Sequence, residues 1–176
     1  YISDNGRPFP RAKITLYDSG IRTPWIVRWP AGVKEGSVTS RLVSSVDIAP
    51  TFLELAGIPS SSLFQGRSFA KILSNPSAKI RDYVYAEKHW HDYDDQCRAV
   101  RSERFKYIRN FYPDLPATPS ADGVRSPTYR RTLALRGEGK LTPPQQNIFL
   151  APRPTEELYD CQTDPHEIVN LARDPR

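Results

Sequence analysis

The chain has 176 residues, a length typical of one domain or of one compact portion of a larger protein. Its net charge of +5 is spread along the chain without a clustered basic face, which argues against a nucleic-acid-binding protein. No apolar run approaches the roughly 18 residues that a membrane-spanning helix needs.

The composition is that of a folded chain with many turns. Hydrophobic residues make up 38% of the sequence, which is enough for a core, and the 17 prolines favour loops over long helices. Two cysteines, Cys97 and Cys161, are too few for a disulfide framework. They either form one disulfide or remain as two buried free thiols, and neither has the spacing of a metal site.

The opening quarter of the chain predicts short extended segments. Ile2–Gly6 is typical of a strand end that enters a loop, and the prolines at 8 and 10 keep the next residues extended. Residues 14–17 are compatible with a short strand or a single helical turn. The apolar run Pro24–Trp29, bounded by Pro30 and Gly32, predicts a buried strand.

The next part of the sequence predicts helices. Ser45–Ala56 has an apolar face, Asp47 as a candidate cap and Gly57 as a stop signal. Ser68–Leu73 predicts a second, shorter helix.

From residue 82 onward the sequence favours a small antiparallel sheet with helical insertions. Residues 102–104 separate two of the expected strands and predict a hairpin. Ser126 and Thr142 precede prolines and are typical of helix starts. The expected strands are residues 83–86, 97–102, 105–111 and 156–160, and the expected helices begin at 127 and 143.

Polar side chains with hard oxygen donors follow the first expected strand. Asp4 and Asn5 offer a carboxylate and a carboxamide, which suit calcium or magnesium better than a transition metal. Adjacent strand residues point to opposite faces, so both could reach one ion only where the strand gives way to a turn, which Gly6 permits. An ordinary Asp-Asn-Gly turn is the competing interpretation.

Three further side chains are candidates for binding an anion. Lys13 is compatible with a solvated surface lysine or with a cation that holds an anionic group beside the metal. His89 and His91 stand at the end of an expected strand, where they would bind or protonate an anion, or lie in an exposed loop. No third ligand at a useful spacing supports a zinc site. His166, after Asp164-Pro165, is expected in a turn.

Four segments resemble the C-terminal part of a type I sulfatase, a member of the alkaline phosphatase superfamily. They are SDNG…AKITLYDSGIRTPWIVRWP, SSVDIAPTFLELAGI, RAVRSERFKYI and ELYDCQTDPHEIVNLA. They occur in the family's order and cover nearly the whole chain, apart from residues 112–150. The Pro-Phe-Pro turn before Lys13, the spacing of the two histidines and the DPHE…NLA ending are most similar to the heparan N-sulfatase (sulfamidase) branch.

The resemblance implies roles for the candidate residues. Asp4 and Asn5 match late calcium ligands, Lys13 matches the basic residue that contacts the substrate sulfate, and His89 or His91 would line the substrate pocket. A sulfated small molecule or glycan is the implied substrate, with no nucleic-acid or membrane partner. The family leads us to expect a periplasmic, secreted or lysosomal location.

The family's nucleophile is a formylglycine made from cysteine or serine in a Cys/Ser-x-Pro-x-Arg motif. Cys97 is followed by RAVR and Cys161 by QTDP, so neither fits, and no serine has the pattern. We therefore expect the formylglycine and the early calcium ligands in a preceding part of a longer protein. The chain on its own is expected to be inactive.

The resemblance also implies the fold, an α/β class that becomes α+β in the second half. Residues 1–80 would be the last part of the catalytic α/β domain, at the edge of a large mixed sheet. Residues 81–176 would form a small C-terminal antiparallel-sheet subdomain with helices. A truncated sheet exposes unpaired backbone groups, so we expect self-association or strand exchange of the isolated chain.

Two other functions are compatible with the sequence. A phosphodiesterase or phosphonate hydrolase of the same superfamily would share the scaffold and differ in its nucleophile. A non-catalytic module that binds sulfated glycans would use an aromatic and basic face, for which the candidates are Trp90, Tyr93, Arg98, Tyr107 and Arg109.

Overall fold

The computed structural model describes residues 1–175, which fold as two compact units. The first unit comprises Tyr1–Trp25, Ala86–Val100 and the chain from Arg104 onward, and the second comprises Ile26–Tyr85 with Arg101–Glu103. The opening segment therefore belongs with the C-terminal sheet and not with the helices that follow it in sequence. A division of the longer protein at residue 80 stays a prediction.

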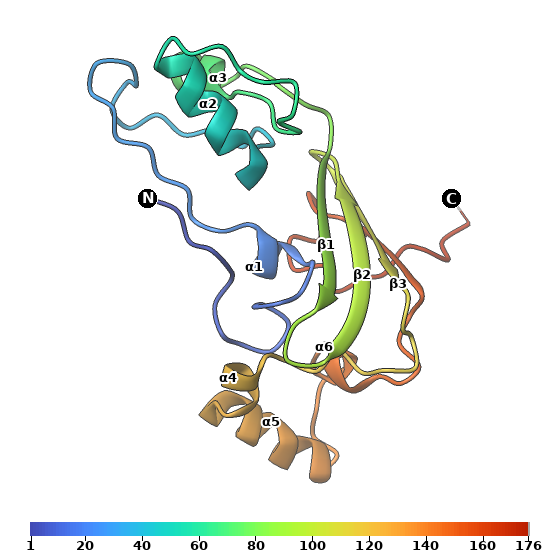
Figure 1. The fold of residues 1–176 in the computed structure, drawn as a ribbon. Coiled ribbons are helices and arrows are strands. Elements are labelled where there is room, and N and C mark those ends of the chain that lie inside the picture. Colours follow the sequence, from blue (N-terminus) through green and yellow to red (C-terminus); the bar gives the residue numbers. More distant parts are fainter. Residues whose placement is uncertain (176) are drawn as a thin grey trace. The chain divides into compact units, whose positions relative to one another are not determined.

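A four-stranded antiparallel sheet forms the centre of the first unit (Figure 1). Its strands lie in sequence order and are β1 (Val84–Trp90), β2 (Asp94–Arg101), β3 (Phe105–Asn110) and β4 (Glu156–Asp160). In the β3–β4 pair, Phe105 lies opposite Asp160 and Tyr107 opposite Leu158. The expected hairpin at 102–104 and the last strand are confirmed, while β1 and β2 extend further toward each other than the sequence indicates.

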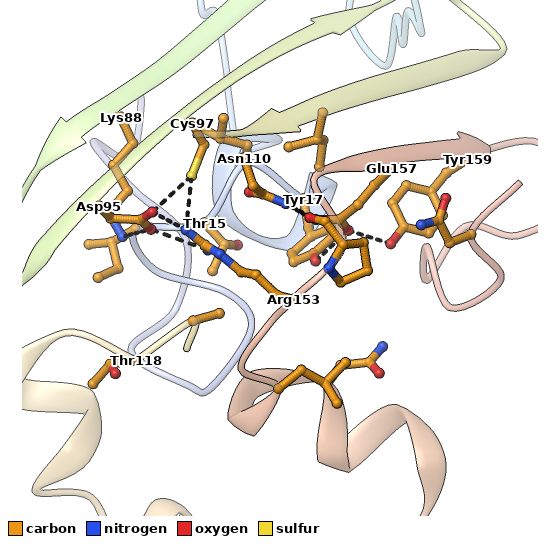
Figure 2. A pocket seen from close by; sticks show the side chains of 18 of the residues that line it. Thr15, Tyr17, Lys88, Asp95, Cys97, Asn110, Thr118, Arg153, Glu157 and Tyr159 are labelled. Carbon is orange, nitrogen blue, oxygen red and sulfur yellow. Dashed lines mark hydrogen bonds and ion pairs between the residues drawn. The ribbon is translucent and has the colours of Figure 1, made fainter. Parts of the chain in front are cut away.

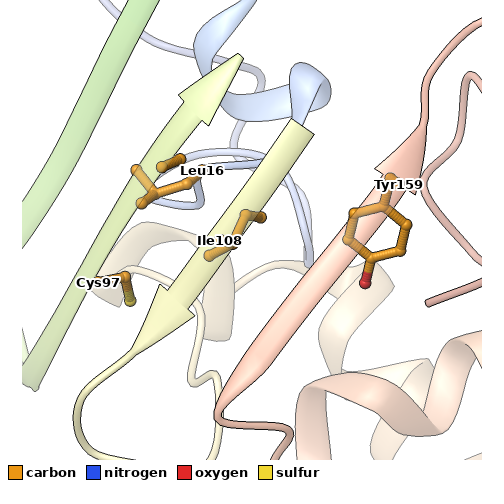
Figure 3. Close-up of a cluster of buried hydrophobic side chains, with 5 residues drawn as sticks. Leu16, Cys97, Ile108 and Tyr159 are labelled. Carbon is orange, nitrogen blue, oxygen red and sulfur yellow. The ribbon is translucent and has the colours of Figure 1, made fainter. Parts of the chain in front are cut away.

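One face of the sheet is buried because alternate residues of each strand point to the same side. Cys97, Ala99, Ile108 and Tyr159 come from β2, β3 and β4 and pack with Leu16 of the opening segment (Figure 3). Helix α1 (Asp18–Ile21) follows directly, and Ile21 packs against the same cluster. The opening segment is thereby anchored on the sheet. Cys97 and Cys161 are both free thiols, so the disulfide does not form.

The helices of the second unit are η1 (Ser45–Asp47), α2 (Ile48–Leu55) and α3 (Ala70–Ser74). The buried Asp47 ends η1 and directly precedes α2. The Asp47 carboxylate is fully buried, accepts the backbone N–H of Ser44 at 2.8 Å and of Arg67 at 2.7 Å, and forms an ion pair with Arg81. The predicted helix is confirmed, and Gly57 ends it with a φ of +70°.

The helical insertions of the first unit are α4 (Ala121–Val124), α5 (Pro127–Gly137), α6 (Pro143–Gln146) and η2 (Asn147–Phe149). Of these, α5 and α6 begin at the predicted caps. The Ser126 hydroxyl accepts the Tyr129 N–H at 3.2 Å, and Thr142 forms a capping box with Gln145. No helix in the part of the chain that the structure describes is long and apolar enough to cross a membrane.

The prediction of a buried strand at Pro24–Trp29 is wrong. Trp25 forms a single antiparallel bridge with Ile2, and the side chain of Ile26 is 60% exposed. A strand needs neighbours that satisfy its N–H and C=O groups along its length, and this run forms an isolated bridge to Ile2, beside the Ser3 N–H that donates to the Pro24 carbonyl, instead of a ladder.

Candidate functional site

The Asp-Asn-Gly motif is held by backbone contacts to the segment before Pro24. The Ser3 N–H donates to the Pro24 carbonyl at 3.2 Å and the Gly6 N–H to the Gly20 carbonyl at 3.0 Å. A Cβ atom at Gly6 would lie 2.2 Å from the Ser19 carbonyl oxygen, so only glycine fits there. The motif is therefore a fixed turn.

The donor set of this turn fits a hard cation. Asp4 is exposed, and the Asn5 side-chain nitrogen donates to the Gly6 carbonyl at 2.7 Å. That bond uses the amide nitrogen, whereas the amide oxygen is the atom that would ligate calcium. Two oxygen ligands are a fraction of the six to eight that calcium takes, so these residues could supply only part of a site.

Lys13 lies on a loop that the C-terminal tail holds in place. The backbone is unusual on both sides of Ala12 and Lys13: the φ angle is +63° at Arg11 and also at Ile14. The Arg11 guanidinium lies 3.8 Å from the centre of the Tyr17 ring and donates to the carbonyl oxygens of His166 and Glu167. These contacts maintain a backbone conformation that non-glycine residues seldom adopt. His166 lies in the predicted turn.

Acidic side chains gather around Lys13. Its ammonium nitrogen lies 2.7 Å from Asp122 Oδ2, and the two side chains are 23% and 49% exposed. The hydrogen bond to Asp122, with the charges of Asp4 and Asp92, raises the pKa of Lys13. The same hydrogen bond holds the pKa of Asp122 well below its usual range. Lys13 is thus a charged side chain that shares its site with three carboxylates.

His91 belongs to the same cluster. It lies in the turn between β1 and β2, and its Nδ1 is 3.0 Å from Asp92 Oδ2. Figure 1 shows this turn close to α4. The same carboxylate oxygen accepts the Ala121 N–H at 2.6 Å. This N–H, aided by the His91 ring, lowers the pKa of Asp92. Because Asp122 is the next residue after Ala121, α4 connects His91 with Lys13.

His89 has different surroundings. It lies within β1, its Nε2 is 3.1 Å from Glu87 Oε2, and its side chain is 55% exposed. The ion pair between Arg98 and Glu87, at 3.7 Å, lies beside it. The two histidine rings therefore do not lie side by side on one face of a strand, because His91 lies beyond the end of β1.

Sequence reasoning did not single out Arg11 or Asp122. Arg11 is isolated in sequence from its partners at 166 and 167, and Asp122 is 109 positions from Lys13. A proline-rich loop gives no periodic signal that could have placed Asp122. Only its Asp-Gly pair marks a turn.

The one group of three possible metal-ligating side chains within residues 1–175 is already occupied by a lysine. The ligand atoms of Asp18, Cys161 and Glu167 lie within 4.8 Å of one another. Lys106, which is fully buried, places Nζ 2.5 Å from Asp18 Oδ1 and 2.7 Å from Glu167 Oε1. Burial raises the pKa of Glu167, and Lys106 opposes that rise. This cluster is a structural ion pair.

A cavity of about 170 Å³ lies on the buried side of the sheet (Figure 2). Asp95 lines it and is bonded by Arg153 and, at 2.8 Å, by Lys88. Burial opposes ionisation of Asp95, but these two partners outweigh it and lower its pKa. Glu157 is likewise engaged, with Tyr17 at 2.7 Å and Asn110 at 2.7 Å. Since both carboxylates are bonded within the protein, the cavity is a polar part of the core rather than an anion site.

The aromatic and basic face considered for glycan binding is exposed but balanced in charge. Arg98 and Arg109 lie 5.9 and 5.6 Å from the centre of the Phe111 ring. Each guanidinium also faces an acid, because Arg98 lies near Glu87 and Arg109 is 3.3 Å from Glu156. Tyr107 donates to Glu156 as well, at 2.6 Å. Partnered arginines give this face little net attraction for a sulfated glycan.

Comparison with known proteins identifies one family. The family model described as "N-sulphoglucosamine sulphohydrolase, C-terminal" matches residues 11–128. An ulvan-active sulfatase of Formosa agariphila is 40% identical over 177 residues, which is 99% of this chain and 29% of that protein. Human N-sulphoglucosamine sulphohydrolase is 31% identical over 187 residues, covering 100% of this chain and 37% of the human protein.

Solved structures show the same relationship. A protein solved in complex with its substrate D-glucosamine-2-N,6-O-disulfate has a TM-score of 0.62 and 25% identity, over 91% of this chain and 26% of that one. A putative sulfatase from Bacteroides thetaiotaomicron has a TM-score of 0.60 and 28% identity, over 93% and 28%. The chain spans about a third of the length of the curated relatives that it matches.

Proposed function

Because the chain belongs to the family of N-sulphoglucosamine sulphohydrolase C-terminal domains, we propose that the full-length protein hydrolyses sulfate esters or sulfamates of sulfated carbohydrates. The observation that carries the proposal is the position of Lys13. The Lys13 side chain extends from a loop with a fixed backbone conformation. The charge of Asp4, a candidate calcium ligand, helps to raise the pKa of the Lys13 ammonium group. A fixed cation is what a transferring sulfuryl group requires.

Lys13 would bind a sulfate oxygen. Hydrolysis keeps negative charge on the sulfuryl oxygens and develops more on the leaving oxygen or nitrogen. A fixed ammonium group stabilises that charge without having to reorganise during the reaction. Removing one such group commonly costs about 2.7–4 kcal/mol of transition-state stabilisation.

Asp4 and Asn5 would hold calcium together with ligands from other parts of the full-length protein. Bound calcium would supply positive charge for the sulfuryl oxygens. The rigid turn supports this assignment, and so does the Asn5 amide, whose nitrogen is the atom that bonds to Gly6.

His91, rather than His89, would face the substrate. Its hydrogen bond with Asp92 places a proton on Nδ1 and leaves Nε2 to contact a hydroxyl or the leaving group. Its link through α4 to Lys13 supports the choice, and His89 is engaged with Glu87 instead.

The nucleophile would come from a segment outside these residues. The properties of Cys97 support this proposal, because burial raises the pKa of its thiol to about 12 and the residues after it do not match the family's nucleophile motif. We therefore propose that the 176-residue chain alone does not turn over substrate.

The test is turnover of para-nitrophenyl sulfate and of N-sulfated glucosamine by the full-length enzyme. Lys13→Ala is expected to lower kcat/KM by roughly 100- to 1,000-fold, whereas Lys140→Ala, at an exposed lysine, should leave it unchanged. His91→Ala should reduce turnover more than His89→Ala, and chelation of calcium should reduce it in a manner that added calcium reverses. Cleavage of phosphodiesters without sulfate hydrolysis would favour the phosphodiesterase alternative. Tight binding of sulfated glycans without turnover would favour a binding module.

A further inference from the structure

The side chains of this chain that act on Lys13 are acidic. Asp122 forms a 2.7 Å ion pair with it, and Asp4 and Asp92 lie close enough to raise its pKa. His91 is the other titratable group of the cluster, through its 3.0 Å contact with Asp92. An anion that reaches Lys13 therefore meets a carboxylate already bound there.

Asp122 is held in position by its own helix. Its Oδ1 accepts the Gly123 N–H at 3.0 Å, while Oδ2 binds Lys13. The helix itself is tied to the β1–β2 turn by the Ala121 N–H, which donates to Asp92 at 2.6 Å. With one oxygen bonded to the backbone, the carboxylate stays close to Lys13 even when an incoming anion takes over the ammonium group.

A fixed negative charge repels anions in proportion to their own charge. A sulfate ester carries one negative charge, whereas the second ionisation of a phosphate monoester has a pKa of ~6, so that ester carries two charges in alkaline solution. Each extra charge adds another unit of repulsion from Asp122. The attraction of Lys13 alone would favour the doubly charged anion.

We propose that Asp122 is a specificity-determining residue that makes the Lys13 site favour singly charged sulfate esters over doubly charged phosphate esters. The inference rests on the proposed role of Lys13 in binding the sulfate group. It assigns to α4 a role in selecting the substrate and not in the chemical step.

The test compares two anions of similar shape and different charge on the full-length protein at fixed calcium concentration. Dissociation constants of benzenesulfonate, a monoanion, and phenyl phosphate, a dianion above neutral pH, are measured by calorimetry for the wild type and Asp122→Asn. Interactions between exposed charges are worth about 0.2–1 kcal/mol, so Asp122→Asn should strengthen phenyl phosphate binding by roughly 1.4- to 5-fold more than benzenesulfonate binding.

Two further variants complete the test. Asp122→Glu keeps the charge and should retain the wild-type ratio of the two dissociation constants. Asp114→Asn removes one exposed negative charge elsewhere in the first unit and should also leave the ratio unchanged.

An equal change for both anions, a shifted ratio in Asp114→Asn, or failure of either anion to bind the wild type would overturn the proposal. Because the experiment measures binding, its result does not depend on whether the enzyme turns over substrate. Sulfate hydrolysis with an unmoved ratio would refute the role of Asp122 alone, whereas absence of hydrolysis would refute the proposed function.

Discussion

Replacing the buried Lys106 by methionine is expected to destabilise the first unit strongly. Lys106 is the cation shared by Asp18 and Glu167, which lie 2.5 and 2.7 Å from its Nζ. Methionine fills much of the same volume, so the loss is chiefly that of charge compensation. Breaking a buried ion pair by removing one partner costs about 3–5 kcal/mol. That would lower the ratio of folded to unfolded protein by roughly 100- to 4,000-fold.

The destabilisation should shrink as pH falls. Burial already raises the pKa of Glu167, and removing Lys106 takes away the attraction that opposes this rise. The folded variant therefore binds a proton at Glu167 more readily than the unfolded chain does. This stabilisation is complete below the pKa of Glu167 in the unfolded chain, and it is lost as pH rises through the higher pKa of the folded state. The free energy of unfolding of Lys106→Met should approach the wild-type value toward mildly acidic pH.

The assay is denaturant unfolding of the full-length protein, with amide hydrogen exchange of β3 and β4 to locate the effect in this unit. Lys140→Met is the matched control, since Lys140 is 67% exposed in its contact with Glu138. A combined variant with Asp18→Asn and Glu167→Gln should regain part of the lost stability, because it removes both uncompensated charges. If Lys106→Met behaves like Lys140→Met at every pH, the cluster does not stabilise the fold as described.

Three further predictions concern other parts of the molecule. Ser126→Ala removes the cap of α5 and should cost about 1 kcal/mol of local stability, visible as faster amide exchange at Tyr129, whereas unchanged exchange would contradict the capping role. The Cys97 thiol, whose pKa burial raises to about 12, should resist iodoacetamide in the native protein and react after unfolding, as read by mass spectrometry; rapid native labelling would refute its burial. The isolated chain should self-associate in light scattering, because Phe52 and Leu63 are 69% and 89% exposed, and a strictly monomeric chain would contradict this.

Local signals in the sequence predicted several elements well. Ser126 and Thr142 mark helix starts through caps that act within three residues, and Gly57 ends α2 by adopting a positive φ. The alternation around Ile108 and Tyr159 and the turn at 102–104 predicted paired strands. The helix caps, the helix stop and the hairpin turn depend on neighbours in sequence, so composition and spacing were sufficient for them.

Other features required partners that local patterns do not specify. Pro24–Trp29 has the residues of a buried strand, but a strand forms only beside another strand, and this run makes an isolated bridge between Trp25 and Ile2 instead of a ladder. Similarly, the buried position of Lys106 follows from two carboxylates, Asp18 and Glu167, that lie far from it in sequence.

For the candidate site, the sequence by itself determined which side chains are proposed to carry chemistry. Asp4, Asn5, Lys13 and the two histidines are recognisable by type and spacing and by their resemblance to a family. Tertiary structure alone decided which of them share a site and what surrounds them. Packing of α4 on the β1–β2 turn brings Asp122 to Lys13 and separates the setting of His91 from that of His89. Electrostatic interactions act through space, so two of the three carboxylates that raise the pKa of Lys13 come from residues about 80 and 110 positions away.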